Sequence, residues 1–199
     1  MSTMSRPMTG AHWVPQVRDS RDLARRMLAP LPLRWHHTVG VARRAADLAD
    51  LLGLDADREV LVAAAWLHDI GYAPPLVDTG FHPLDGAVYI DRHGWPRRLA
   101  ALVAHHSGAR FVAEAHGLDD ALARYVAEES VVADALTYAD QTVGPRGERL
   151  SLEERLRDVL SRHGPESPTA QVQGVREARI REAARRVEAR ISPTPSAQG

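Results

Sequence analysis

The stretch Trp66-Leu67-His68-Asp69-Ile70-Gly71 decides the fold predicted for this chain. It places an imidazole and a carboxylate side by side at the end of an apolar helical run, residues 61–67, which Gly71 and the Pro74-Pro75 pair then bring to an end. Adjacent His and Asp at a buried helix end are costly unless something compensates them. A divalent metal ion suits both side chains at once. The stretch therefore predicts a metal site to which other segments contribute ligands.

The composition is that of one soluble domain with modest extensions. The chain has 199 residues and a formal net charge of −1, which gives no reason to expect a nucleic-acid or membrane partner. It contains no Cys, so a thiolate metal site is excluded, but it contains 10 His. With no long apolar run and no signal-peptide pattern, we expect a cytoplasmic protein.

Prolines, glycines and capping residues divide the chain into predicted helices, and no segment alternates as a strand does. The fold class expected is therefore all-α. The predicted helices are 21–28, 32–52, 57–69, 83–93, 96–107, 109–116, 119–127, 129–142, 151–163 and 171–191. The predicted organisation is a loosely ordered leader at 1–18, a main helical domain at 19–163, a linker and C-terminal helix at 164–191, and a disordered tail at 192–199.

Helical periodicity indicates which polar residues face inward. His37 shares a face with Val41 and Leu48, whereas His36 shares the polar face. A single inward His is more often satisfied by a backbone carbonyl than by a metal. Several together need compensating positive charge, which two metal ions bridged by one carboxylate would supply. The inward candidates are His37, His68, Asp69, His82, His105, His106 and Asp140.

The order His37, then His68-Asp69, then Asp140 on helices resembles the HD-domain metal-dependent phosphohydrolases, and Ile70-Gly71 makes it the HDIG type. The resemblance covers roughly residues 30–145. It implies an HD-domain helical bundle, to which this chain adds a C-terminal helix.

Within this superfamily, the chain is most similar to the HD-type symmetrical dinucleoside tetraphosphate hydrolases. The similarity rests on three segments and the Ala139-Asp140 pair: Arg34-Trp35-His36-His37-Thr38-Val39-Gly40-Val41-Ala42, His82-Pro83-Leu84-Asp85-Gly86-Ala87, and His105-His106-Ser107-Gly108. Tyr72 stands where related enzymes often have Lys. The Gly-Tyr-Pro signature of the cyclic-di-GMP phosphodiesterases is missing after His106, which disfavours that branch.

The resemblance implies a site that binds one or two divalent transition metal ions, with Fe, Mn or Co favoured over Mg or Zn. One ion would be held by His37, His68, Asp69 and Asp140. The second would be held by His82 and His105, with Asp69 as the bridging catalytic carboxylate and His106 as an optional extra ligand. Arg34 is expected to bind substrate phosphate, with Arg110 and Arg146 as weaker candidates. The arginines of the C-terminal helix are expected to form a salt-bridged, solvated face.

The function expected from this resemblance is metal-dependent hydrolysis of a nucleotide phosphoester or phosphoanhydride, with a dinucleoside polyphosphate as the sharper hypothesis. The alternatives are a nucleoside monophosphate, (p)ppGpp or cyclic-dinucleotide hydrolase, and a non-catalytic ligand-sensing HD module. The expected partner is a phosphorylated small molecule, and homodimer formation is left open.

Overall fold

The computed structural model describes residues 17–162 and 171–192. Within these ranges the regular elements are all helical, and extended pairing is limited to an isolated bridge between Val143 and Arg149. The all-α prediction is confirmed. Residues 1–16, 163–170 and 193–199 lie outside the described residues, and they include most of the predicted leader and tail and the predicted linker that begins at 164. No helix in the described ranges is long and apolar enough to cross a membrane.

The helices begin and end close to the predicted positions. They are α1 (Val17–Leu28), α2 (Pro32–Leu51), α3 (Arg58–Leu67), α4 (His82–Arg92), α5 (Arg97–His105), α6 (Ala109–Ala115), α7 (Asp119–Leu122), α8 (Val131–Asp140), α9 (Leu152–Arg162) and α11 (Gln173–Ile191), with short 3-10 turns η1 (Ile70–Tyr72), η2 (Pro74–Leu76) and η3 (His106–Gly108).

Helix α7 is the clearest departure, because it ends five residues before the predicted boundary. Beyond the end of α7, the backbone carbonyl of Tyr125 accepts a hydrogen bond from the ring of His105, at 2.6 Å. Ser130 then starts α8, and its hydroxyl accepts a hydrogen bond from the backbone N–H of Ala133.

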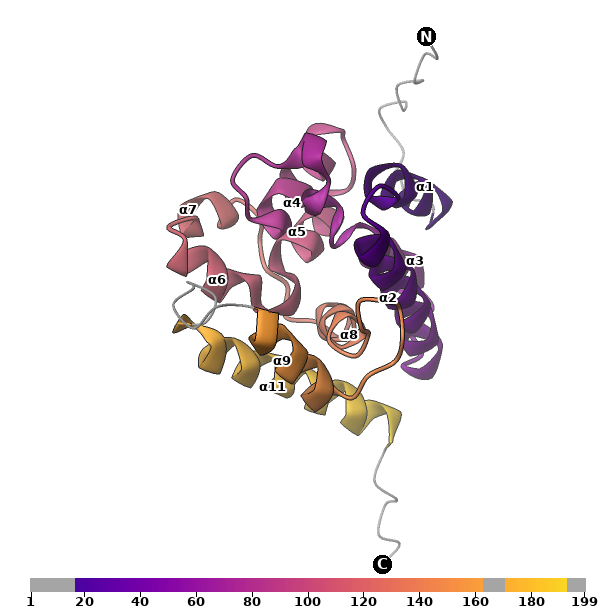
Figure 1. Ribbon diagram of the computed structural model, residues 1–199. Helices are drawn as coiled ribbons and strands as arrows, with labels where there is room; N and C mark the ends of the chain where they lie inside the picture. The colour runs from indigo at the N-terminus through magenta and orange to yellow at the C-terminus, as the bar shows by residue number, and fades with distance from the viewer. Residues whose placement is uncertain (1–16, 163–170, 193–199) are drawn as a thin grey trace, which may run out of the picture.

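The core lies where α2, α3 and α8 meet, with α1 packed on α3 and with α4 paired to α5 (Figure 1). The consecutive alanines Ala63, Ala64 and Ala65 are fully buried, and their small side chains let neighbouring helices approach α3 closely. Burial of Leu61 and Leu67 on the same helix adds about 1.5–3 kcal/mol of stabilisation each. This packing places the C-terminal end of α3, and therefore His68 and Asp69, inside the bundle.

The C-terminal helix α11 packs along α8 and reaches η3 (Figure 1). Helix α9 runs beside it, joined by the Arg181–Glu153 ion pair at 3.0 Å. Helix α11, which follows Asp140 in the chain, therefore covers the region around η3.

Two glycines allow the backbone contacts that assemble the site. A Cβ on Gly71 would lie 2.0 Å from the carbonyl oxygen of His82, so η1 and the start of α4 touch only because residue 71 has no side chain. A Cβ on Gly40 would lie 2.8 Å from the Cα of Gly147. The loop after α8 can therefore approach α2 closely because residue 40 has no side chain. These contacts bring His82 to Asp69, and the backbone of Gly144 to His37.

Candidate metal centre

The first ligand group joins three helices. His37 comes from α2, His68 from the end of α3 and Asp140 from the end of α8, and all three are buried. The Nε2 of His37 lies 3.0 Å from the Oδ1 of Asp140, and the Nε2 of His68 lies 3.9 Å from the same oxygen. The structure thus brings together three of the residues that the sequence predicts as ligands.

The second ligand group consists of Asp69, His82 and His106. The Nε2 of His82 lies 3.3 Å from the Oδ1 of Asp69 and 3.4 Å from the Nε2 of His106. His82 is held in place by the ring of Tyr72, which stacks on it with the centroids 3.9 Å apart.

The carboxylate of Asp69 connects the two groups. Its Oδ2 lies 3.5 Å from the Nε2 of His68 and 3.9 Å from the Nε2 of His37, while its Oδ1 faces His82. Ligand atoms bound about 2.1 Å from one ion lie about 3.0–3.4 Å from one another. The separations of 3.0, 3.3 and 3.4 Å fall within this range, and the remaining ones are 3.5–3.9 Å. Asp69 is placed as a bridging carboxylate would be.

Backbone carbonyls fix the tautomers of three of the imidazoles. A carbonyl can only accept, so the ring Nδ1 that contacts it donates, and the Nε2 of the neutral ring carries a lone pair toward the site. The pairs are His37 with Gly144 at 3.2 Å, His68 with Ala65 at 2.8 Å and His106 with Val103 at 2.7 Å.

The donor set fits a divalent metal ion. Burial lowers the pKa of His68 and His82, so these rings favour the neutral form. The Nε2 of His68 is fully buried and has no hydrogen-bond partner in the described structure, which is unusual for a polar atom. Neutral nitrogen lone pairs set against carboxylate oxygens repel unless a cation lies between them.

Both carboxylates are held in the ionised form. Burial acts to raise the pKa of Asp69, but its neighbours, the Arg34 guanidinium among them, outweigh this effect and bring the pKa below its ordinary value. Burial opposes ionisation of Asp140 in the same way, and its neighbours, the Arg155 guanidinium among them, bring its pKa well below the ordinary value. Ionised oxygens and neutral imidazoles are the forms that ligate metals.

Ser107 and Gln141 orient Asp140, and sequence reasoning gave neither of them a role. The Ser107 hydroxyl donates to the Oδ2 of Asp140, and the Gln141 side-chain amide donates to the same oxygen at 2.7 Å. The Oδ1 is thereby left to face His37. Ser107 adopts φ 52° and ψ 36° to reach this position, a conformation that few residues other than glycine adopt. Its place next to His106 was the only sequence signal.

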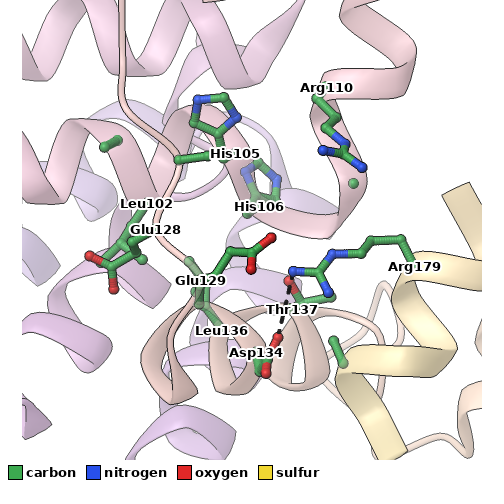
Figure 2. Close-up of a pocket in the computed structure, with 15 residues that line it drawn as sticks. Leu102, His105, His106, Arg110, Glu128, Glu129, Asp134, Leu136, Thr137 and Arg179 are labelled. Carbon is green, nitrogen blue, oxygen red and sulfur yellow. Dashed lines mark ion pairs between the residues drawn. The ribbon is translucent and has the colours of Figure 1, made fainter. Parts of the chain in front are cut away.

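The prediction that His105 is a metal ligand is corrected by the structure, because His106 lies in the ligand group instead. The Nε2 of His105 bonds the Tyr125 carbonyl, and its ring lies at a separate hollow of about 80 Å³ that Arg110 and Arg179 also line (Figure 2). Helical periodicity does not separate the two histidines, because both lie over apolar residues of α5.

A cavity of about 450 Å³ opens onto both ligand groups. Three cations line it, Arg34, Arg155 and Arg176. The Nη1 of Arg34 lies 3.0 Å from the Oδ2 of Asp69, and its guanidinium stacks 3.9 Å from the ring centroid of Tyr72. Arg34 therefore lies at the predicted site, as an ion pair with the central carboxylate.

The other predicted cations lie elsewhere. Arg110 stacks on Phe111 and lines the smaller hollow, and Arg146 is exposed on the loop after α8. On α11, Arg179 and Arg186 form the expected ion pairs with Glu182, at 3.5 and 2.5 Å, and both also reach Asp134. Arg176 departs from that pattern because it turns into the cavity.

One wall of the cavity is a loop fastened by Asp85. Its two carboxylate oxygens accept hydrogen bonds from the backbone N–H groups of Asp78, Thr79 and Gly80, at 3.0–3.2 Å. This buried acceptor holds the segment before His82, which supplies Gly80 and Phe81 to the cavity.

Comparison with known proteins agrees with this geometry. The HD domain family model matches residues 34–160, so the chain belongs to the HD domain family, whose members are in general metal-dependent phosphohydrolases. The chain is also similar to Ribonuclease Y of Thermus thermophilus, with 35% identity over 151 residues. That similarity covers 72% of this chain but only 23% of the relative. No solved structure matches the chain.

Proposed function

We propose that this protein is a metal-dependent phosphohydrolase that cleaves a nucleotide phosphoester or phosphoanhydride, with a dinucleoside polyphosphate as the preferred substrate. The observation that carries the proposal is the position of Asp69, whose two carboxylate oxygens face separate groups of imidazoles. A carboxylate shared in this way is what a pair of ions needs.

His37, His68, Asp69 and Asp140 would hold one ion, and Asp69, His82 and His106 would hold the other. Bound metal supplies a nucleophilic water of lowered pKa and offsets phosphoryl charge. Imidazole and carboxylate donors without thiolates favour Fe, Mn or Co over Mg or a structural zinc site.

The chain's own residues bind and orient the substrate. Arg34 stands beside Asp69 and presents a planar guanidinium suited to two phosphoryl oxygens. Burial, with a smaller effect of Asp69, raises the pKa of Tyr72 to about 12, so its hydroxyl stays protonated and can donate a hydrogen bond to the substrate.

The shape and lining of the cavity support a nucleotide. Its volume of about 450 Å³ lies within the range of small-molecule sites, roughly 300–1,000 Å³. Phe81 and His116 stack on each other with centroids 6.2 Å apart and line the cavity, offering flat surfaces to a base. The likeness of the His37 and His82 segments to the dinucleoside tetraphosphate hydrolases supports the finer substrate assignment.

The test is a hydrolysis screen with Mn²⁺ on the wild-type chain and on Asp69→Ala. The panel holds diadenosine tetraphosphate, ADP, AMP, ppGpp, a cyclic dinucleotide and a short RNA. Cleavage of diadenosine tetraphosphate to ADP, lost in Asp69→Ala, is the expected result. Preference for another compound of the panel would replace the dinucleoside polyphosphate as the proposed substrate. Cleavage of RNA would point toward the activity named for the Thermus relative. A wild-type protein inactive on the whole panel would favour a ligand-sensing role.

A further inference from the structure

The cavity at the metal centre is completed by a residue from outside the HD segment. The family match ends at residue 160, and Arg176 lies beyond it on α11. The side chain of Arg176 passes close over η3, since a Cβ on Gly108 would lie 3.1 Å from its Cγ. Its Nε donates a hydrogen bond to the Ser107 carbonyl at 3.0 Å.

The guanidinium of Arg176 is incompletely satisfied. Its Nη1 is buried and has no hydrogen-bond partner among the described residues. Burial lowers the pKa of Arg176, and the nearby charge of Arg155 lowers it too, against the opposing effect of Asp140. Because arginine remains charged in proteins, a buried donor of this kind is costly unless a ligand completes its hydrogen bonds.

Asp140, the acidic residue that acts on Arg176 across the cavity, is already engaged. Its Oδ1 contacts His37 at 3.0 Å and belongs to the first ligand group. Its Oδ2 accepts hydrogen bonds from Ser107 and Gln141. Among the described residues, Asp140 therefore gives the Nη1 of Arg176 no hydrogen bond.

Arg34 and Arg176 line the same cavity from different helices. Arg34 lies beside Asp69 and is placed for the reacting phosphoryl group, whereas Arg176 comes from α11. A guanidinium binds phosphate oxygens through paired, charge-assisted hydrogen bonds. The guanidinium of Arg176 is therefore suited to a second phosphate joined to the first.

We infer that Arg176 binds a second phosphate group and makes the site selective for phosphoanhydrides over monophosphates. Arg176 is thus a specificity-determining residue that the C-terminal helix supplies to the HD domain. The inference rests on the proposed function in treating this cavity as the substrate site.

The test measures binding without turnover on the full chain loaded with Mn²⁺. The probes are methylenediphosphonate, a pyrophosphate analogue that is not hydrolysed, and methylphosphonate, and their affinities are measured by titration calorimetry. The variants are Arg176→Gln and Arg176→Lys. The matched control is Arg185→Gln, because Arg185 is an exposed arginine of the same helix, away from the cavity.

The wild-type protein is expected to bind the diphosphonate more tightly than the monophosphonate. Arg176→Gln should weaken diphosphonate binding about tenfold or more, with little effect on the monophosphonate, since it removes a charge-assisted hydrogen bond. Arg176→Lys should restore part of the affinity, and Arg185→Gln should match the wild type.

An unchanged preference in Arg176→Gln would overturn the inference. An equal loss of affinity for both probes would also overturn it, and so would a fall in Mn content that Arg176→Lys does not restore. In either case Arg176 would act only by supporting Ser107. Failure of the proposed function looks different: the protein would bind diphosphonate through Arg176 yet hydrolyse neither phosphoesters nor phosphoanhydrides. Conversely, the protein could hydrolyse nucleotides while Arg176→Gln keeps the wild-type preference for diphosphonate over monophosphonate. That result would support the proposed function and contradict the role of Arg176.

Discussion

His82 and His106 face each other in the second ligand group, with their Nε2 atoms 3.4 Å apart. They come from different elements, the start of α4 and the turn that follows α5. The Nε2 of His82 also lies opposite the Oδ1 of Asp69. Each of the two rings therefore has one nitrogen available for a cation.

Replacement of His106 by Ala should therefore release metal, while replacement of the adjacent His105 should not. His106 belongs to the ligand group, whereas the His105 ring bonds the Tyr125 carbonyl. Mass-spectrometric metal analysis of the two purified variants provides the check. Metal loss only in His105→Ala would show that the two rings are assigned the wrong way round. Equal loss in both variants would show that the two rings do not differ in metal binding.

Ser107→Ala should weaken metal binding by about 10- to 100-fold, the usual effect of losing a residue that orients a ligand. The substitution removes the hydroxyl that holds the Oδ2 of Asp140 and keeps the Ser107 carbonyl that Arg176 bonds. Competition with a chelator of known affinity measures the change. Wild-type affinity in this variant would mean that Gln141 alone orients Asp140.

Gly71→Ala should destabilise the fold by about 3 kcal/mol or more, because its Cβ would overlap the backbone carbonyl of His82. Gly174→Ala is the matched control, since a Cβ there meets no atom within 4 Å, and its effect should stay below about 1 kcal/mol. Denaturant unfolding gives both values. Similar stabilities for the two variants would contradict the close contact between η1 and α4.

Asp85→Asn should loosen the loop before His82 and cost about 1–3 kcal/mol, because one of the two oxygens that accept backbone N–H groups is lost. Hydrogen exchange at residues 78–80 should become faster. Asp91→Asn, an exposed position on the same helix, serves as the control and should leave exchange at these residues unchanged. Slow exchange in both variants would remove Asp85 as the anchor.

Much of the fold could be predicted because its signals are local. Proline, glycine and capping residues mark helix ends, and Pro32 and Ser130 lie where α2 and α8 begin. Periodicity separated His37 from His36, because along a helix only one of two adjacent residues follows the apolar face; His37 is buried and His36 is exposed.

The rest of the site depends on long-range packing. His105 and His106 stand at the end of α5, where both lie over apolar residues and the helical pattern no longer discriminates. Arg176 lies in a helix that alternates Arg with Glu, so its local pattern indicates a solvated face. Only the packing of α11 on η3 shows that this one arginine turns inward.

Asp69 connects the two ligand groups, and the proposed hydrolysis depends on it. The most direct measurement is the number of Mn²⁺ ions bound per chain by wild type and Asp69→Ala, taken with the hydrolysis rate of the same samples. We predict about two ions per chain in the wild type, and loss of bound metal together with hydrolysis in the variant. Wild-type metal content and rate in Asp69→Ala would contradict the claim.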